Sequence, residues 1–228
     1  MKTSEFKVTK IIGLFITVFS LAVLNMQIFN SLISAAFINS DGEENMAAIS
    51  GMISTGSSGN FKFEIIQSLV YFDLEGNPQK VGAILGSKSG GSDSVVVNIS
   101  NSFISSNIAS DSTILVVVNF NNNQSMNISN SLIQTNSSSL TGSSIEVNSD
   151  KSVIIPWDFN NNSIDDSLNT SQMSGFEIFD TSSYSENYFI NNWALSGNDS
   201  VWLINSGESL PYLFWQEEPL PEQIINQP

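Results

Sequence analysis

The sequence predicts an all-β protein, a right-handed parallel β-helix or β-roll of about three repeats. An aromatic cap is expected at its C-terminal end and a signal or anchor helix before it. Two observations favour this fold. The segment NISNSFISSN at 98–107 recurs as NISNSLIQTN at 127–136, and apolar residues alternate with polar ones inside it. A third observation, a group of large aromatic residues near the C-terminus, predicts the cap.

The first 36 residues predict a leader. Three lysines precede an apolar run at 11–24, which has the length of a signal-peptide core. Polar residues interrupt the following stretch, which argues against a full membrane span. Ser34 and Ala36 have the spacing of a cleavage site, so cleavage is expected before Phe37. An uncleaved membrane anchor is the alternative, and in both cases the rest of the chain lies outside the cytosol.

Residues 37–142 are expected to hold the repeats. MAAISG at 46–51 matches VGAILG at 81–86, and TILVVV at 113–118 is a degenerate third copy. EIIQSLV at 64–70 places Ser68 in the position of Ser102. A unit of this size cannot bury its apolar face alone, whereas stacked copies can.

Within a repeat, the alternation of residues predicts strands. Val95, Val97 and Ile99 fall on one side of a strand and would point inward together. Asparagines that recur at one position of the repeat are expected to stack as a hydrogen-bonded ladder. Biased composition alone would explain the abundance of Asn and Ser, but it would not explain their shared frame.

Residues 143–216 are expected to form a C-terminal module of β-repeat and cap, followed by a flexible acidic, proline-containing tail at 217–228. A solenoid needs a terminal cap over its open end, and large rings supply buried area for it. The alternative is a sugar-binding platform, for which the candidate ligand-facing aromatic residues are Trp202, Tyr212 and Trp215.

Composition excludes several classes of function. The formal net charge is −15, with 7 basic and 22 acidic residues, and every basic residue is a lysine. Phosphate binding needs clustered Lys and Arg, so no nucleic-acid partner is expected. Contact with a membrane is expected only through the N-terminal segment, if it stays uncleaved. The chain has no histidine and no cysteine, which removes the commonest acid–base catalyst and all thiolate chemistry, and no cofactor is expected.

Acidic and amide residues offer weak candidates for a metal site. Asp158, Asn160, Asn162 and Asp166 alternate as in the start of a calcium loop. Ser163 stands where such a loop needs glycine, so a polar turn is expected and no metal. Seven N-x-S/T sequons follow from the composition alone: Asn98, Asn123, Asn127, Asn136, Asn161, Asn169 and Asn198.

Paired carboxylates occur at 43–44, 165–166 and 217–218. Neighbouring strand residues point to opposite faces, so these pairs do not flank a bond as glycosidase carboxylates must. The sequence therefore predicts no catalysis.

Several of these motifs resemble the GLUG-motif repeat family. VGAILGSKSGG at 81–91 is similar to its glycine–hydrophobic repeat, and Asn101-Ser102 and Asn130-Ser131 stand in its strand. LNTSQM at 168–173, FINNWAL at 189–195 as a tryptophan strand, and ESLPYLFWQ at 208–216 resemble its closing region. Leu210 replaces the first tyrosine of that region.

This resemblance implies a secreted or cell-surface, adhesin-like protein with a structural or binding role. A glycan or another cell-surface ligand would be its partner, and no enzymatic activity is expected. A passive surface spacer or coat protein is one alternative. A polysaccharide-cleaving β-helix enzyme with distant carboxylates is the other.

Overall fold

A computed structural model describes most of the chain, and its architecture is mostly parallel β-sheet with few helices. The described residues are 16–18, 22–37, 46–55, 59–75, 81–89, 94–109, 115–118, 124–135, 139–141, 145–156, 175–179, 184–193, 195 and 200–225.

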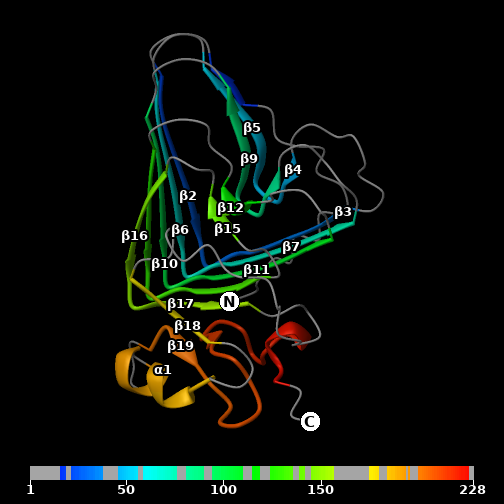
Figure 1. The fold of residues 1–228 in the computed structure, drawn as a ribbon, viewed down its shortest axis with the longest axis vertical. Coiled ribbons are helices and arrows are strands. Elements are labelled where there is room, and N and C mark those ends of the chain that lie inside the picture. Colours follow the sequence, from blue (N-terminus) through cyan, green and yellow to red (C-terminus); the bar gives the residue numbers. More distant parts are fainter. Residues whose placement is uncertain are drawn as a thin grey trace.

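Three parallel sheets make up the main body (Figure 1). We name them A, B and C. Sheet A contains β1 (Ile16–Val18), β5 (Ser50–Thr55), β9 (Leu85–Ser89), β12 (Leu115–Val118) and β15 (Ser139–Thr141). Sheet B contains β2 (Ala22–Phe29), β6 (Gly59–Ile66), β10 (Ser94–Ser100), β13 (Gln124–Ser129) and β16 (Ile145–Asp150). Sheet C contains β3 (Leu32–Phe37), β7 (Leu69–Glu75), β11 (Phe103–Ala109), β14 (Leu132–Thr135), β17 (Ser152–Ile155) and β18 (Phe176–Ile178).

The chain visits sheets A, B and C in turn, and we call each such pass a coil. Coil 1 is β1–β2–β3, coil 2 is β5–β6–β7, coil 3 is β9–β10–β11, coil 4 is β12–β13–β14 and coil 5 is β15–β16–β17. Two short strands, β4 (Met46–Ala47) and β8 (Val81–Gly82), pair in parallel beside sheet A. The arrangement is compatible with a parallel β-helix or β-roll, so the predicted all-β parallel class is confirmed.

Strand register confirms the repeats found in the sequence. Asn98 pairs with Asn127, as the repeat of NISNS predicts, and Met46 pairs with Val81. The degenerate third copy is displaced by one residue, because Val118 pairs with Leu85 rather than with its neighbour Gly86. The estimate of about three repeats was too low, since coils 1 and 5 also belong to the stack.

The helix expected in the first 36 residues is not what residues 22–37 form. They form β2 and β3, which pair with β6 and β7 along their full lengths. Residues 1–15 and 19–21 of that segment lie outside the described residues.

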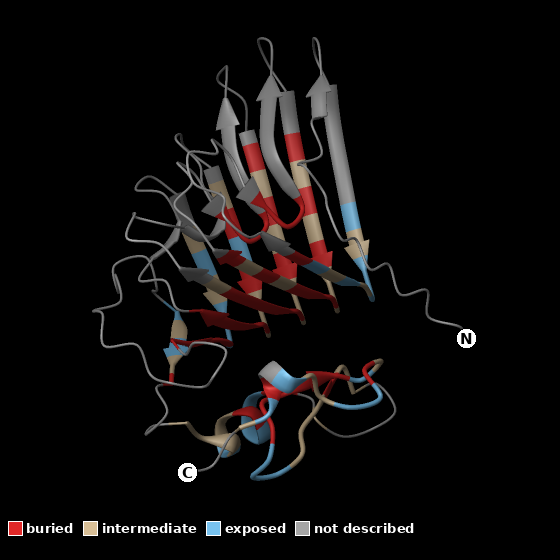
Figure 2. Cartoon of the chain, turned by 90° about the vertical axis from the view of Figure 1, so that its right-hand side faces the viewer, coloured by how far each residue is buried: buried red, intermediate tan, exposed pale blue. Residues whose placement is uncertain are grey.

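The core of the stack is formed by the inward residues of sheets B and C, together with Ala48, Ile49, Ala83 and Ile84 beside sheet A. Val95, Val97 and Ile99 are fully buried, as their alternation predicts. Phe61 and Phe63 occupy the corresponding positions one coil earlier. Figure 2 shows this alternation of burial along the described strands.

A tight corner joins each strand of sheet B to the next strand of sheet C. Its first residue has the left-handed conformation, which Asn tolerates better than other residues that have a side chain. The corner residues and their φ angles are Asn30 (46°), Gln67 (49°), Asn101 (49°), Asn130 (43°) and Lys151 (51°).

The second corner residue is always serine, and these serines form a ladder. The Ser102 Oγ donates to the Ser100 carbonyl at 2.8 Å and accepts from the Ser68 N–H at 3.2 Å. The Ser131 Oγ in turn accepts from the Ser102 N–H at 3.1 Å. The same pattern continues to Ser31 and Ser152, so every corner is tied to its neighbour.

The described residues of 179–225 form a module that packs against the outer face of sheet C (Figures 1 and 2). We call it the lateral module. It contains the helix α1 (Glu186–Asn192), the antiparallel strands β19 (Trp202–Leu203) and β20 (Tyr212–Leu213), and a 3-10 helix (Pro221–Gln223).

The lateral module differs from the sequence prediction in three respects. The aromatic residues cover the side of the solenoid and not its open end. The segment FINN of the expected tryptophan strand lies in α1. Residues 217–225 of the expected flexible tail belong to the lateral module, where the Ile225 N–H donates to the Glu208 carbonyl at 2.9 Å.

Candidate binding face and the buried aromatic residues

The predicted ligand-facing aromatic residues are packing residues of the lateral module. Trp202 is 1% exposed and lies against Trp193, with ring centroids 4.7 Å apart. Tyr212 is 7% exposed, and its hydroxyl donates to the Asn205 side chain at 3.0 Å. Trp215 is half-buried against the same cluster. The rings of Trp202 and Tyr212 therefore do not face solvent.

These rings pack on apolar side chains that point outward from sheet C. Leu69, Phe103, Leu132 and Val153 share one position in four consecutive coils and are buried together with the module. Their neighbours along each strand belong to the core inside the stack. Near the start of its strands, sheet C is thus apolar on both faces, as expected for a sheet that is covered on both faces. Further along β11 and β14 the buried residues are polar and pair across the strands, Ser105 with Gln134 and Ser106 with Thr135.

Two indole N–H groups fasten the module to the corners of the solenoid. The Trp193 Nε1 donates to the Lys151 carbonyl at 2.7 Å, in coil 5. The Trp215 Nε1 donates to the Gln67 carbonyl at 2.6 Å, in coil 2. The attachment therefore spans coils 2 to 5. The Trp202 Nε1, by contrast, is buried without a hydrogen-bond partner.

Two buried glutamines hold the last residues of the module in place. The Gln216 Nε2 donates to the Gln223 Oε1 at 2.8 Å. The Gln223 Nε2 donates to the Pro211 carbonyl at 3.2 Å. Buried amides satisfied in this way fix the conformation of the segment.

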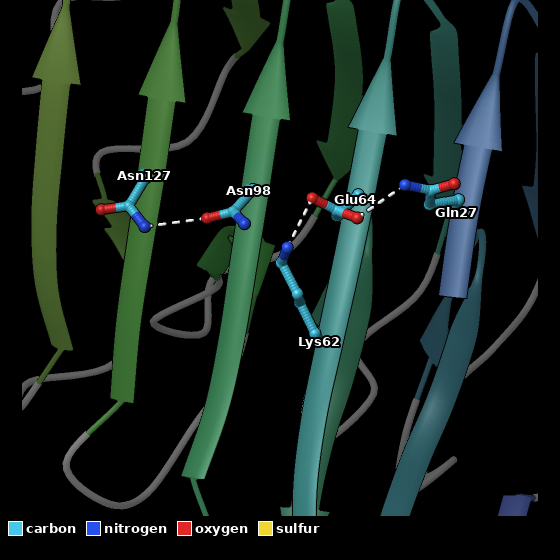
Figure 3. A network of polar contacts seen from close by, with 5 residues as sticks. All are labelled: Gln27, Lys62, Glu64, Asn98 and Asn127. Atoms are coloured by element: carbon cyan, nitrogen blue, oxygen red, sulfur yellow. Dashed lines mark hydrogen bonds and ion pairs between the residues drawn. The ribbon is translucent and has the colours of Figure 1, made fainter. Parts of the chain in front are cut away.

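The outer face of sheet B carries a different set of residues. We give the name amide column to the residues at one position in coils 1 to 5: Gln27, Glu64, Asn98, Asn127 and Asn148. Figure 3 shows the first four of them. The Asn127 Nδ2 donates to the Asn98 Oδ1 at 2.8 Å, and the Asn148 Nδ2 donates to the Asn127 Oδ1 at 3.2 Å. The predicted asparagine ladder is confirmed.

At coils 1 and 2 the amide column includes a charge. The Glu64 carboxylate accepts from the Gln27 Nε2 at 2.7 Å and pairs with the Lys62 ammonium at 2.7 Å. The hydrogen bond from Lys62, followed by that from Gln27, holds the pKa of Glu64 below its usual value. Glu64 is therefore ionised at neutral pH, with its charge balanced by Lys62.

The amide column retains unused hydrogen-bonding capacity. A side-chain amide has two donors and an acceptor oxygen with two lone pairs. The ladder uses one donor of Asn127 towards Asn98 and accepts one bond from Asn148. Gln27, Asn127 and Asn148 are exposed, so the remaining groups face solvent.

The other candidate sites from the sequence are only partly described. The Asp158 loop and the acidic pairs at 43–44 and 165–166 lie outside the described residues, while Glu217 and Glu218 are exposed. Within the described ranges, no three acidic residues come together as a metal site would need. Of the sequon asparagines, Asn98 and Asn127 lie in the amide column, and the other five are outside the described part.

The sequence analysis missed three members of the amide column. Gln27 lies in the segment assigned to the leader, Glu64 differs in type from the asparagines, and Asn148 lies in coil 5, outside the NISNS repeat. The detectable signal was their spacing to Ser31, Ser68 and Ser152, which equals the spacing of Asn98 to Ser102.

A comparison with protein-family models, with curated proteins and with solved structures finds no match to this chain. The resemblance to GLUG-motif repeats gains no support from it. Across the part of the chain that the structure describes, no helix is both long enough and apolar enough to span a membrane.

Proposed function

We propose that this protein is a secreted or cell-surface adhesin-like protein that binds a neutral glycan chain along the amide column without catalysing a reaction. The observation that carries the proposal is the continuity of this column on an exposed face through all five coils. We further propose that the coils wind right-handed, as connections between parallel strands do in about 98% of cases.

A glycan fits the chemistry of the column. Sugar hydroxyls both donate and accept hydrogen bonds, as side-chain amides do. Adjacent strands lie about 4.8 Å apart, so the five positions form a straight row roughly 19 Å long. A linear polymer lying along the solenoid axis would contact several amides at once, and weak contacts in series add up to useful affinity.

The negative charge of the protein limits which kinds of glycan can bind. The chain has a net charge of −15, and the one carboxylate of the column is already paired with Lys62. A polyanionic glycan would be repelled by the protein as a whole. The expected ligand is therefore uncharged.

Binding of the purified protein to immobilised neutral polysaccharides tests the proposal. We expect saturable binding that weakens roughly fivefold in Asn127→Ala, the loss of about one hydrogen bond. The control is Asn192→Ala, which removes an exposed amide from α1, where its Nδ2 donates to the Tyr188 carbonyl at 2.8 Å. Binding should be unchanged in the control.

One observation favours the alternative function, a passive surface spacer. Trp202 and Tyr212 are buried, and this removes the aromatic platform on which many sugar sites depend. If the protein binds no polysaccharide in the assay, or if Asn127→Ala and Asn192→Ala bind equally well, the spacer becomes the better explanation.

A further inference from the structure

The corner motif of the solenoid is also present in the segment predicted to be a leader. Asn30-Ser31-Leu32 has the same three residues as Asn130-Ser131-Leu132 in coil 4. Asn30 has the same left-handed conformation, with φ 46°. The Ser31 Oγ donates to the Phe29 carbonyl at 2.9 Å, as the other corner serines do two residues back.

Coil 1 forms hydrogen bonds with coil 2 at the corner, in the amide column and along both paired strands. The Leu69 N–H donates to the Ser31 carbonyl at 2.8 Å, and the Ser31 N–H donates to the Ser68 Oγ at 3.2 Å. The Gln27 amide binds Glu64 at the start of the amide column. β2 and β3 also pair with β6 and β7 in unbroken register.

Cleavage before Phe37 would remove nearly all of this coil. β2 would be lost entirely, and only the last residue of β3 would remain. β6 and β7 would then replace β2 and β3 as the edge strands of sheets B and C, and the Leu69 N–H would lose the Ser31 carbonyl as its acceptor. The predicted cleavage position therefore conflicts with the repeat.

We propose that residues 23–37 belong to the mature protein as coil 1, and that the leader is removed between Ala22 and Val23. Ser20 and Ala22 are small residues with the −3 and −1 spacing that signal cleavage requires, the same rule that Ser34 and Ala36 satisfy. The lysines at 2, 7 and 10 and the apolar residues at 11–19 then supply the basic and the apolar parts of the leader. The cut falls at the first residue of β2 and removes only the three residues of β1 from sheet A.

The N-terminus of the exported protein tests this directly. The full chain, with a C-terminal affinity tag, is exported from a secreting host, and its N-terminal peptide is identified by mass spectrometry. The expected peptide begins at Val23. A peptide that begins at Phe37, or an uncut chain, overturns the proposal.

A matched pair of variants separates the two cleavage positions. Ala22→Leu places a large residue at −1 of the proposed site and should abolish the Val23 terminus. Ala36→Leu makes the same change at the rival site and should leave the terminus unchanged. The opposite pattern contradicts the assignment.

Hydrogen exchange on the exported wild-type protein tests whether coil 1 is folded. The Leu69 amide depends on the Ser31 carbonyl, whereas the Phe103 amide donates to the Ser68 carbonyl inside the stack at 2.9 Å. We expect protection at Leu69 to lie within about tenfold of that at Phe103. Exchange of Leu69 at the unfolded rate, with Phe103 protected, would show that coil 1 is not part of the mature fold.

Discussion

The solenoid and the lateral module are held together in different ways. In the solenoid, one set of contacts repeats: a left-handed corner, a serine bond to the next coil and an inward apolar residue. The module has no such repeat and depends on a cluster of rings and two buried glutamines. A repeated contact can be lost from one coil while the others remain. An irregular cluster depends on each large member.

We expect the largest loss of stability from Trp202→Ala, in the lateral module. Trp202 is among the largest fully buried side chains, so its truncation leaves a large cavity. We expect a loss of about 3–5 kcal/mol in the free energy of unfolding, measured by urea denaturation. Trp202→Phe should lose less, because the Trp202 Nε1 has no hydrogen-bond partner to forfeit. Equal losses in the two variants would show that ring volume does not decide the effect.

Removing one step of the serine ladder should have a smaller effect. Ser102→Ala leaves the buried Ser68 N–H without its acceptor, which we expect to cost about 1–3 kcal/mol in urea denaturation. Ser125→Ala changes a half-exposed serine on the outer face of β13 and should stay within about 0.5 kcal/mol of wild type. If Ser102→Ala is as stable as Ser125→Ala, the serine ladder does not contribute measurably to stability.

The corner conformation gives a third, smaller effect. Asn101→Ala places a residue without a local polar side chain at φ 49°, and we expect a loss of about 1 kcal/mol. Asn101→Gly has no such penalty and should be close to wild type. Thermal melts of the two variants would separate backbone conformation from side-chain contacts, and identical melting temperatures would rule out the conformational explanation.

The two regions should also differ in their response to pH. Burial, followed by the charge of Glu186, raises the pKa of Tyr184, and burial also raises the pKa of Tyr188. The raised pKa values of these two tyrosines stabilise the module at pH values below the usual tyrosine pKa of about 10. This stabilisation is lost as the pH rises above that value. We expect the module to lose its packing at a lower pH than the solenoid when the protein is titrated with alkali. Near-ultraviolet circular dichroism would monitor the titration. Loss of both in one step would contradict this.

Glu64 gives the smallest effect and acts on the other region. Its lowered pKa stabilises the solenoid above the usual glutamate value of about 4.3, and this contribution disappears as pH falls below it. Glu64→Gln should therefore flatten the acid side of a stability–pH curve slightly. An unchanged acid limb would mean that the pair with Lys62 adds nothing measurable, as is common for exposed ion pairs.

Repetition decided which parts of this fold could be predicted from the sequence. The strands around Asn98 and Asn127 were found because two copies of NISNS share a frame, and the frame fixes register as well as strand type. Coil 5 was missed because Lys151 stands where the other corners have an amide. Coil 1 was missed because its apolar residues also suit a leader, and a three-residue Asn-Ser-Leu corner is a short signal beside that longer apolar run.

The lateral module could be predicted in composition but not in position. Its rings were correctly assigned to packing as the favoured interpretation, but nothing in their spacing says which surface they cover. That surface was encoded in sheet C, where Leu69, Phe103, Leu132 and Val153 occupy an outward position. The amide column was predictable only as far as the asparagines extend.

The hydrogen bond from Trp215 to Gln67 joins residues 148 positions apart in the sequence. During synthesis, coil 2 leaves the ribosome long before the residue that fastens it. Contacts between distant parts of a chain slow folding, because the intervening loop must close first. The native flank of this protein can therefore assemble only after Trp215 has been synthesised.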